Sequence, residues 1–263
     1  MVPITQDALR GRMALVTGST GGIGLAVASS LAAAGSDVVL HGLASPEEGG
    51  AVAVDLAERY AVQVCYRRAD LAQPDAIAAM VAEVGMPDIL VNNAATRHFG
   101  PIEAMPAADW DSDMAVNLSA VFHLIRLSLP GMRARGWGRI LNMSSIYGLV
   151  GATGRVGYVT TKTALIGLTR ATALETAASG ITCNALCPGT TMTPNIAGRI
   201  GAAMAAAGLD EAAAMAQFLA GKQPTGRFVA AEAIGAMAAF LCSEAGRDIT
   251  GAVLPMDGGW SAM

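Results

Sequence analysis

The sequence predicts an α/β fold in which helices cover both faces of a doubly wound parallel sheet. Short runs of continuous apolar residues, typical of buried parallel strands, alternate with helical segments along the whole chain. The first run, 13–17, stops at a glycine-rich turn and is followed by a helical pattern. The chain has 263 residues, enough for a sizeable core, and shows no linker, repeat or low-complexity segment. We therefore expect a single domain over 1–263.

The expected elements follow from changes in the pattern. Strands are expected at 13–17, 37–41, 62–67, 88–91, 139–143, 181–186 and 252–256. Helices are expected at 25–34, 51–60, 109–135, 157–178 and 230–243, and Pro74 opens a further helix in the first turn, where proline is tolerated. The segment 194–226 is rich in Ala and Met. It is expected to form two short helices, either as a mobile substrate lid within the domain or as ordinary helical packing.

Composition and charge exclude several functional classes. The net charge is −4 and no Lys/Arg cluster stands out, so we expect no nucleic-acid partner. No run of about 18 apolar residues predicts a membrane span, and the N-terminus resembles no signal peptide, so we expect a cytoplasmic protein. The cysteines (Cys65, Cys183, Cys187 and Cys242) form no Cys-x-x-Cys pair and are expected to be reduced and buried. The three histidines are too scattered for a metal site.

A glycine-rich turn, Thr17-Gly-Ser-Thr-Gly-Gly-Ile-Gly24, separates the first strand from the first helix. Such a turn places backbone N–H groups and a helix N-terminus beneath the pyrophosphate of a dinucleotide. Gly18, Gly22 and Gly24 would provide the tight turn, the close approach of backbone to phosphate and the close packing of helix on strand. The alternative is a glycine turn with a purely structural role.

The end of the second strand indicates which dinucleotide would bind. In dinucleotide-binding folds this position faces the adenosine ribose, where an acidic residue favours NAD and an arginine favours NADP. Here the chain reads His41-Gly-Leu-Ala, with neither. No Arg or Lys stands nearby, including at Ser19 and Thr20, to hold a 2′-phosphate. The expected cofactor is NAD, with NADP as the less favoured alternative.

Tyr158 and Lys162 are four residues apart in an expected helix, so their side chains share one face. An ammonium beside a phenol favours the phenolate and lowers the tyrosine pKa from its usual value of about 10. The phenol could then act as a general base for an alcohol or a general acid for a ketone. Ser145, at the end of the strand 139–143, could hydrogen-bond the same substrate oxygen. By itself, Tyr-x-x-x-Lys more often makes only a solvated helix face.

Together these residues resemble the short-chain dehydrogenase/reductase family over nearly the whole chain. The matches are Thr-Gly-x-x-x-Gly-Ile-Gly at 17–24, Asn-Asn-Ala at 92–94, Asn117, Ser145, Tyr158, Lys162 and Pro-Gly-x-x-x-Thr at 188–193. One departure is Ala95, where the family usually has glycine. The resemblance implies a single-domain Rossmann fold, direct hydride transfer between a nicotinamide and a carbinol carbon without a metal, and a homotetramer or homodimer.

The resemblance also implies roles for individual residues. Tyr158 would exchange a proton with a substrate oxygen held by Ser145. Lys162 would bind the nicotinamide ribose, and Asn117 would hold a water in the proton relay. Asp70 and Leu71 would line the adenine pocket, Asn92 would approach the adenosine, and Thr193 would contact the carboxamide or phosphates. The full set of cofactor-binding residues would be Gly18, Thr20, Gly22, Ile23, Gly24, Asp70, Leu71, Asn92, Ala94, Tyr158, Lys162, Pro188, Gly189, Thr191 and Thr193.

Within the family, the chain looks like the D-3-hydroxybutyrate dehydrogenases. Similar stretches are Asn117-Leu-Ser-Ala-Val-Phe-His, Gly180-Ile-Thr-Cys-Asn-Ala-Leu-Cys-Pro-Gly and Asp257-Gly-Gly-Trp. The substrate-contacting positions depart from that subfamily. Its glutamine, histidine, lysine and second glutamine are here Arg97, Tyr147, Arg155 and Arg199, and its tryptophan is Thr190. Arg155 and Arg199 also match positions at which the similar 2-hydroxypropyl-coenzyme M dehydrogenases hold a sulfonate.

Arginines directed at one pocket would bind an anion, because a guanidinium pairs with carboxylate, sulfonate or phosphate oxygens. The expected substrate is therefore a small anionic secondary alcohol or ketone, foremost a 3-hydroxybutyrate-like hydroxy acid. A hydroxyalkyl sulfonate is one alternative, and an NADPH-dependent reductase of 3-oxoacyl thioesters is another. A non-catalytic dinucleotide sensor is disfavoured, because a binding module needs no tuned acid/base pair.

Overall fold

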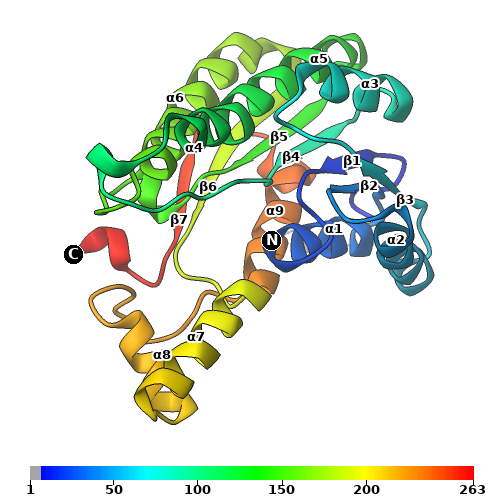
Figure 1. Ribbon diagram of the computed structural model, residues 1–263. Helices are drawn as coiled ribbons and strands as arrows, with labels where there is room; N and C mark the ends of the chain where they lie inside the picture. Colours follow the sequence, from blue (N-terminus) through cyan, green and yellow to red (C-terminus); the bar gives the residue numbers. More distant parts are fainter. Residues whose placement is uncertain (1–6) are drawn as a thin grey trace.

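In the part of the chain that the structure describes, seven parallel strands form one central sheet (Figure 1). The computed structural model describes residues 7–263, without the side chain of Asn195. In spatial order the strands are β3 (Val64–Arg68), β2 (Asp37–Gly42), β1 (Met13–Val16), β4 (Ile89–Asn92), β5 (Gly138–Met143), β6 (Ile181–Pro188) and β7 (Val253–Met256). All neighbouring pairs are parallel. The doubly wound α/β fold predicted from the sequence is confirmed.

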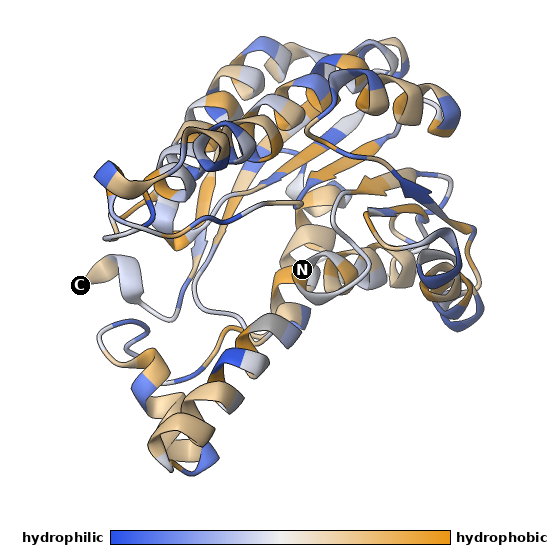
Figure 2. Ribbon diagram, viewed as in Figure 1, coloured by the Kyte–Doolittle hydropathy of each residue, from blue (hydrophilic) through white to orange (hydrophobic). Residues whose placement is uncertain are grey.

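Helices cover both faces of the sheet. One layer contains α1 (Gly22–Ala33), α2 (Pro46–Tyr60) and α9 (Ala231–Cys242), and the other contains α3 (Pro74–Val84), α4 (Ala107–Met114), α5 (Ala120–Arg135) and α6 (Val156–Thr176). The apolar residues of each layer form a separate cluster against the sheet. Figure 2 shows the apolar strands enclosed between helices whose outer faces are more polar. Ile89, Leu90 and Val91 of the central strand β4 are fully buried, which stabilises the fold by about 1.5–3 kcal/mol for each side chain.

The strand order reverses between β1 and β4, and this position determines where a ligand can bind. From β1 the chain continues to β2 on one side, whereas β4 lies on the other side and leads to β5. The loops after β1 and β4 therefore diverge and leave a crevice at the carboxyl ends of the strands. Hydrogen bonds tie the two loops together at their base, because the N–H groups of Asn93 and Ala94 both donate to Oγ1 of Thr17.

The long helix predicted over 109–135 is interrupted. It consists of α4, a π-helical turn at Ala115–Ser119 and α5. Asn117 lies in the π turn and its side chain bonds to Thr96, which fixes the wide turn at this point. The helix predicted over 51–60 in fact begins at Pro46, because Ser45 and Glu48 form a reciprocal capping box.

The segment 194–226 contains two helices, as predicted: α7 (Pro194–Ala207) and α8 (Glu211–Leu219). They project away from the sheet (Figure 1) and pack on each other around a small apolar cluster that includes Ile196, Ile200 and Ala214. This separation from the main core is suited to a lid, but the lid function itself stays a prediction.

One helical run, Ala107–Arg135, is long and apolar enough to cross a membrane by length and composition alone. The helix α5 within it packs against the sheet and against α3, with Leu124, Ile125 and Met132 buried in the core. A core helix passes the same test, so the run is weak evidence for a membrane span. The cysteines are all free, and Cys183, Cys187 and Cys242 are buried while Cys65 is half-buried.

Candidate active site

The glycine-rich turn between β1 and α1 lets three segments of backbone approach one another closely. Gly18 has a φ of +62°, and a Cβ atom there would lie 2.9 Å from the Cα atom of Ala94. A Cβ atom on Gly24 would lie 2.1 Å from the carbonyl oxygen of Gly18, so only glycine lets α1 begin this close to β1. The N–H groups of the first turn of α1 have no partners within the helix. The turn and this helix end form a cradle that fits a pyrophosphate.

A cleft runs from this turn along the carboxyl ends of β1, β2 and β4. The predicted cofactor contacts that line it are Gly18, Thr20, Ile23, Gly24, Asp70, Leu71, Ala94 and Thr193. Gly189, Thr191 and Tyr158 line an adjoining pocket, whereas Gly22, Pro188 and Lys162 line neither cavity. The mixed polar and apolar walls, together with the glycine cradle, fit a nicotinamide dinucleotide.

The side chain of Asn92 does not reach the cleft, contrary to the prediction. It is buried between β4 and β5, where its Nδ2 donates to Oδ1 of Asn142 over 2.8 Å. The next residue, Asn93, lines the cleft, and its Nδ2 donates to the carbonyl oxygens of Thr17 and Gly18, each over 2.9 Å. Successive side chains of a strand point to opposite faces, so the polar contact belongs to Asn93.

His41 at the end of β2 is a neutral structural residue. It is 2% exposed, its Nδ1 accepts the N–H of Gly18 over 3.2 Å, and its Nε2 lies 3.0 Å from the carbonyl oxygen of Ala69. These partners place the single ring proton on Nε2. Burial lowers the pKa of His41, with the Ala69 contact opposing it only in part. His41 therefore supplies no positive charge to the adenosine end of the cleft.

Ser145, Tyr158 and Lys162 come together at the carboxyl end of β5. Tyr158 and Lys162 lie one turn apart in α6 and are 5% and 2% exposed. The Nζ of Lys162 donates to the carbonyl oxygen of Met143 over 2.7 Å and lies 5.5 Å from the centre of the Tyr158 ring. Burial alone would raise the pKa of Tyr158, but the charges of Lys162 and Arg97, with hydrogen bonds to Ser145 and Arg97, lower it on balance. Burial also lowers the pKa of Lys162.

Arg97 has a second role that the sequence did not reveal. Its guanidinium carbon lies 5.0 Å from the centre of the Tyr158 ring, and its side chain lines both the cleft and the adjoining pocket. Among the charges that lower the pKa of Tyr158 and so favour its phenolate, that of Arg97 ranks second after that of Lys162. No local pattern could have shown this contact, because Arg97 follows β4 and Tyr158 lies in α6.

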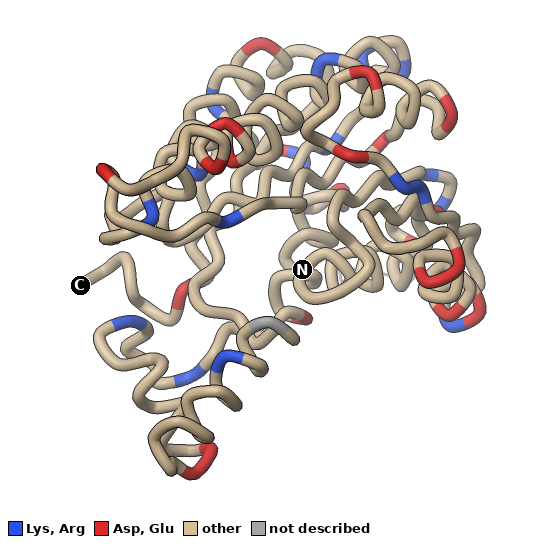
Figure 3. The backbone as a smooth tube through the Cα atoms, in the orientation of Figure 1, with Lys and Arg blue, Asp and Glu red and all other residues tan. Residues whose placement is uncertain are grey.

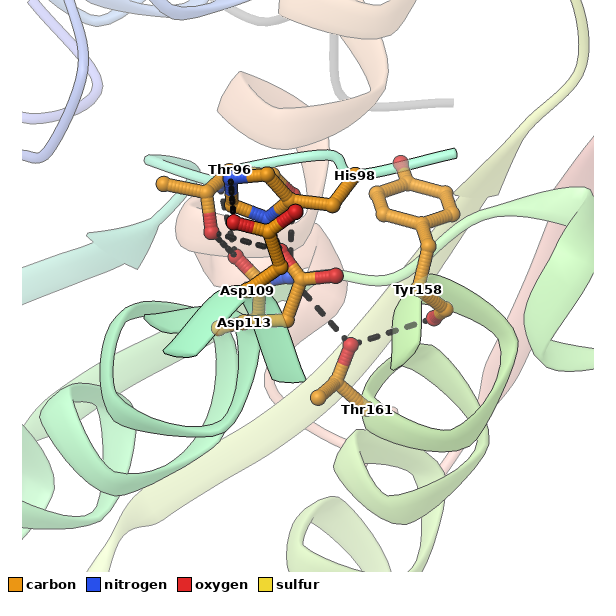
Figure 4. A network of polar contacts seen from close by, with 7 residues as sticks. Thr96, His98, Asp109, Asp113, Tyr158 and Thr161 are labelled. Atoms are coloured by element: carbon orange, nitrogen blue, oxygen red, sulfur yellow. Dashed lines mark hydrogen bonds and ion pairs between the residues drawn. The ribbon is translucent and has the colours of Figure 1, made fainter. Parts of the chain in front are cut away.

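Figure 4 shows a polar network behind Tyr158. Oδ1 of Asn117 accepts the N–H of Thr96 over 2.8 Å, and its Nδ2 donates to the carbonyl oxygen of Thr96 and to Oγ1 of Thr161. Thr161 in turn donates to the carbonyl oxygen of Tyr158. The amide of Asn117 is thus engaged on both sides. The side chain of Asn117 joins the loop after β4 to α6, and the water-holding role of Asn117 stays a prediction.

A buried carboxylate, Asp113, belongs to the same network. It is fully buried, and its Oδ1 accepts from Oγ1 of Thr96 over 2.8 Å and pairs with Nδ1 of His98 over 2.9 Å (Figure 4). Its Oδ2 has no partner among the described residues and faces Gly157, where a Cβ atom would lie only 2.6 Å away. The sequence analysis missed this group, because Asp113 stands in a helix that reads as an ordinary polar surface.

All five predicted substrate contacts line one pocket beside Tyr158 and Ser145; they are Arg97, Tyr147, Arg155, Thr190 and Arg199. The guanidinium of Arg155 lies 4.6 Å from the ring centre of Phe99 and 5.1 Å from that of Tyr147. The prediction missed Phe218, Lys222 and Trp260, which line the same pocket. The sequence shows that Lys222 is a cation, but it does not show that this side chain lines the pocket. That position depends on how α8 packs.

Comparison with known proteins places these residues in a family context. A family model described as enoyl-(acyl carrier protein) reductase matches residues 18–261. The chain is 41% identical to a D-beta-hydroxybutyrate dehydrogenase of Cupriavidus necator, covering 97% of this chain and 99% of that protein. It is 40% identical to a D-beta-hydroxybutyrate dehydrogenase of Rhizobium meliloti, covering 95% of this chain and 99% of that protein.

Among solved structures, the chain resembles an L-sorbose reductase from Gluconobacter frateurii in complex with NADPH and L-sorbose. The TM-score is 0.92 and the identity 30%, and the match covers 97% of this chain and 98% of that chain. The structural likeness therefore includes a protein that uses the phosphorylated cofactor.

Proposed function

Because this chain belongs to the short-chain dehydrogenase/reductase family of oxidoreductases acting on CH–OH donors, we propose that it interconverts a small anionic secondary alcohol and its ketone with NAD. The substrate we favour is a 3-hydroxybutyrate-like hydroxy acid. One observation carries the proposal: Tyr158, with its lowered pKa, opens into a pocket that also presents Ser145, Arg97 and Arg155.

The residues of the pocket divide the chemistry between them. In the oxidation direction the phenolate of Tyr158 removes the hydroxyl proton of the substrate, while Ser145 holds the same oxygen by a hydrogen bond. In the reduction direction the phenol of Tyr158 returns that proton to the carbonyl oxygen. The ammonium of Lys162, whose Nζ lies 5.5 Å from the centre of the Tyr158 ring, favours the phenolate over the phenol. A bound nicotinamide supplies the hydride acceptor or donor.

Our preference for NAD depends on the adenosine end of the cleft. The cations that line this cleft among the described residues are Arg97 and Arg199, and both also line the substrate pocket at the other end. His41 is neutral, and Leu43 is 65% exposed at the rim. A 2′-phosphate would find no charged donor here, whereas an NADP-specific site usually provides one.

The first experiment is the initial rate of NAD⁺ reduction with D-3-hydroxybutyrate, with NADP⁺ as the control. Brisk turnover with NAD⁺ supports the proposal. Binding of NADH without turnover of any anionic alcohol would argue for a dinucleotide sensor instead. Tyr158→Phe should abolish turnover and leave NADH binding, measured by fluorescence, close to that of the wild type.

The arginines provide a test of the substrate charge. Arg155→Met should reduce kcat/KM for 3-hydroxybutyrate by at least about tenfold, because a charge-assisted hydrogen bond is lost. It should reduce turnover of 2-butanol, which carries no charge, much less. Equal losses on both alcohols would contradict the role of Arg155 in anion binding.

We also propose that the protein forms a homotetramer or homodimer. Phe122 on α5 and Leu174 on α6 are 49% and 82% exposed, and burying them against a second copy of the chain would be favourable. Light scattering of the purified chain would measure the mass directly, and a monomeric mass at micromolar concentration would refute the proposal.

A further inference from the structure

The substrate pocket holds more positive charge than one carboxylate can neutralise. Four cationic side chains line it, namely Arg97, Arg155, Arg199 and Lys222, and none of the described residues that line it is acidic. None of the four forms an ion pair with a carboxylate among the described residues. Apart from the phenolate of Tyr158, which is stabilised by Arg97, no anion in the pocket offsets these like charges, so the arrangement indicates a ligand with compensating charge.

The four cations lie on two sides of the pocket. Arg97 follows β4 and Arg155 precedes α6, so both belong to the body of the molecule and lie beside Tyr147 and Tyr158. Arg199 belongs to α7 and Lys222 follows α8. Figure 3 shows basic positions both on the lid segment and on the part of the body that faces it.

Arg199 and Lys222, the two cations of the segment 194–226 that line the pocket, both lie over the ring of Phe218. The Nζ of Lys222 lies 4.2 Å, and the guanidinium carbon of Arg199 5.0 Å, from the centre of the Phe218 ring. Burial lowers the pKa of Lys222, and the charges of Arg199 and Arg155 lower it further. The two pairs are thus near enough to repel each other across the pocket, and an anion that contacts both would remove this repulsion.

We propose that the substrate is a dianionic secondary alcohol with one anionic group held by Arg97 and Arg155 and the other held by Arg199 and Lys222. This inference rests on the proposed function and specifies its substrate class as a hydroxydicarboxylate or a hydroxy acid with a second phosphate or sulfonate group. The second anion draws α7 and α8 toward the body of the molecule. Arg199 also lines the cofactor cleft, so its alternative role is to bind the cofactor phosphates. Lys222 lines only the substrate pocket.

The test compares 3-hydroxyglutarate, a dianion, with its monomethyl ester, a monoanion of nearly the same length. Because 3-hydroxyglutarate is achiral, stereochemistry does not complicate the assay of the diacid, and the ester is used as the racemate. We expect kcat/KM with NAD⁺ to be at least about tenfold higher for the diacid, since one more charge-assisted contact is made. Lys222→Met and Arg199→Met should each lower this diacid-to-ester ratio by about tenfold. The matched control is Arg227→Met, which removes an exposed cation of the same loop outside the pocket and should retain the wild-type ratio.

Two results would overturn the inference. One is an equal kcat/KM for the diacid and the ester. The other is that Arg199→Met and Lys222→Met raise KM for NAD⁺ and leave the diacid-to-ester ratio unchanged, which would assign these cations to the cofactor.

A binding assay separates this inference from the proposed function. Glutarate and its monomethyl ester carry no hydroxyl group, so their affinities for the NADH complex, measured by calorimetry, test the charge requirement even if no alcohol is oxidised.

Discussion

Removing the charge of Arg97 should shift the pH dependence of catalysis. The pKa of Tyr158 is lowered despite burial, and Lys162 and Arg97 are the two charges responsible. Arg97→Met keeps most of the side-chain length but removes the charge, so the pKa of Tyr158 should rise. Oxidation needs the phenolate, so the variant should be slower below this pKa and should recover as the pH rises through it.

The size of the effect follows from the geometry. A unit charge 5.0 Å from the ring centre contributes about 3 kcal/mol at an effective dielectric constant of about 20. The Arg97 side chain is exposed, so solvent and salt reduce this to roughly 1 kcal/mol. That energy corresponds to about a fivefold smaller phenolate fraction at pH values below the pKa. Any loss of anion binding adds a factor that does not change with pH.

The assay is kcat/KM for alcohol oxidation, measured across the pH range for the wild type, Arg97→Met and Arg155→Met. Arg155 lines the same pocket but is not among the main groups that lower the pKa of Tyr158, so it is the matched control. We expect a pH-independent loss for Arg155→Met and a loss for Arg97→Met that shrinks at high pH. A loss for Arg97→Met that is the same at every pH would refute the electrostatic role of Arg97.

Three further substitutions test other parts of the site. Gly24→Ala should weaken NADH binding and lower Tm, at a cost of about 1–3 kcal/mol, because the new methyl group meets the Gly18 carbonyl; unchanged fluorescence titrations would contradict the cradle. Leu43→Arg should raise kcat/KM with NADP⁺ by about tenfold by supplying a phosphate partner, and no gain would place the ribose elsewhere. Gly157→Ala should lower both Tm and kcat, because its methyl group meets the buried carboxylate of Asp113 directly before Tyr158. In the double variant Gly157→Ala/Asp113→Ala, Tm and kcat should both recover in part. If they are no higher than in Gly157→Ala alone, the Asp113 carboxylate is not the group that the new methyl meets.

Local patterns in the sequence predict much of the site. The glycine turn and the four-residue spacing of Tyr158 and Lys162 are properties of short segments, and both lie in the fold where these patterns predict. The same holds for the seven strands, whose continuous apolar runs reflect burial on both faces. The π turn around Asn117 was not predicted, because the contact that holds it comes from Thr96, far away in sequence.

The sequence by itself determined the fold, the residues proposed as acid and base, and the presence of several arginines suited to an anion, since each depends on local spacing or residue type. Only the tertiary structure decided which of these groups meet. It turned Asn93 rather than Asn92 into the cleft, placed Arg97 over Tyr158, and brought Lys222 to the pocket. The physical reason is that such contacts join elements distant in sequence, and their geometry is set by how helices and loops pack on the sheet.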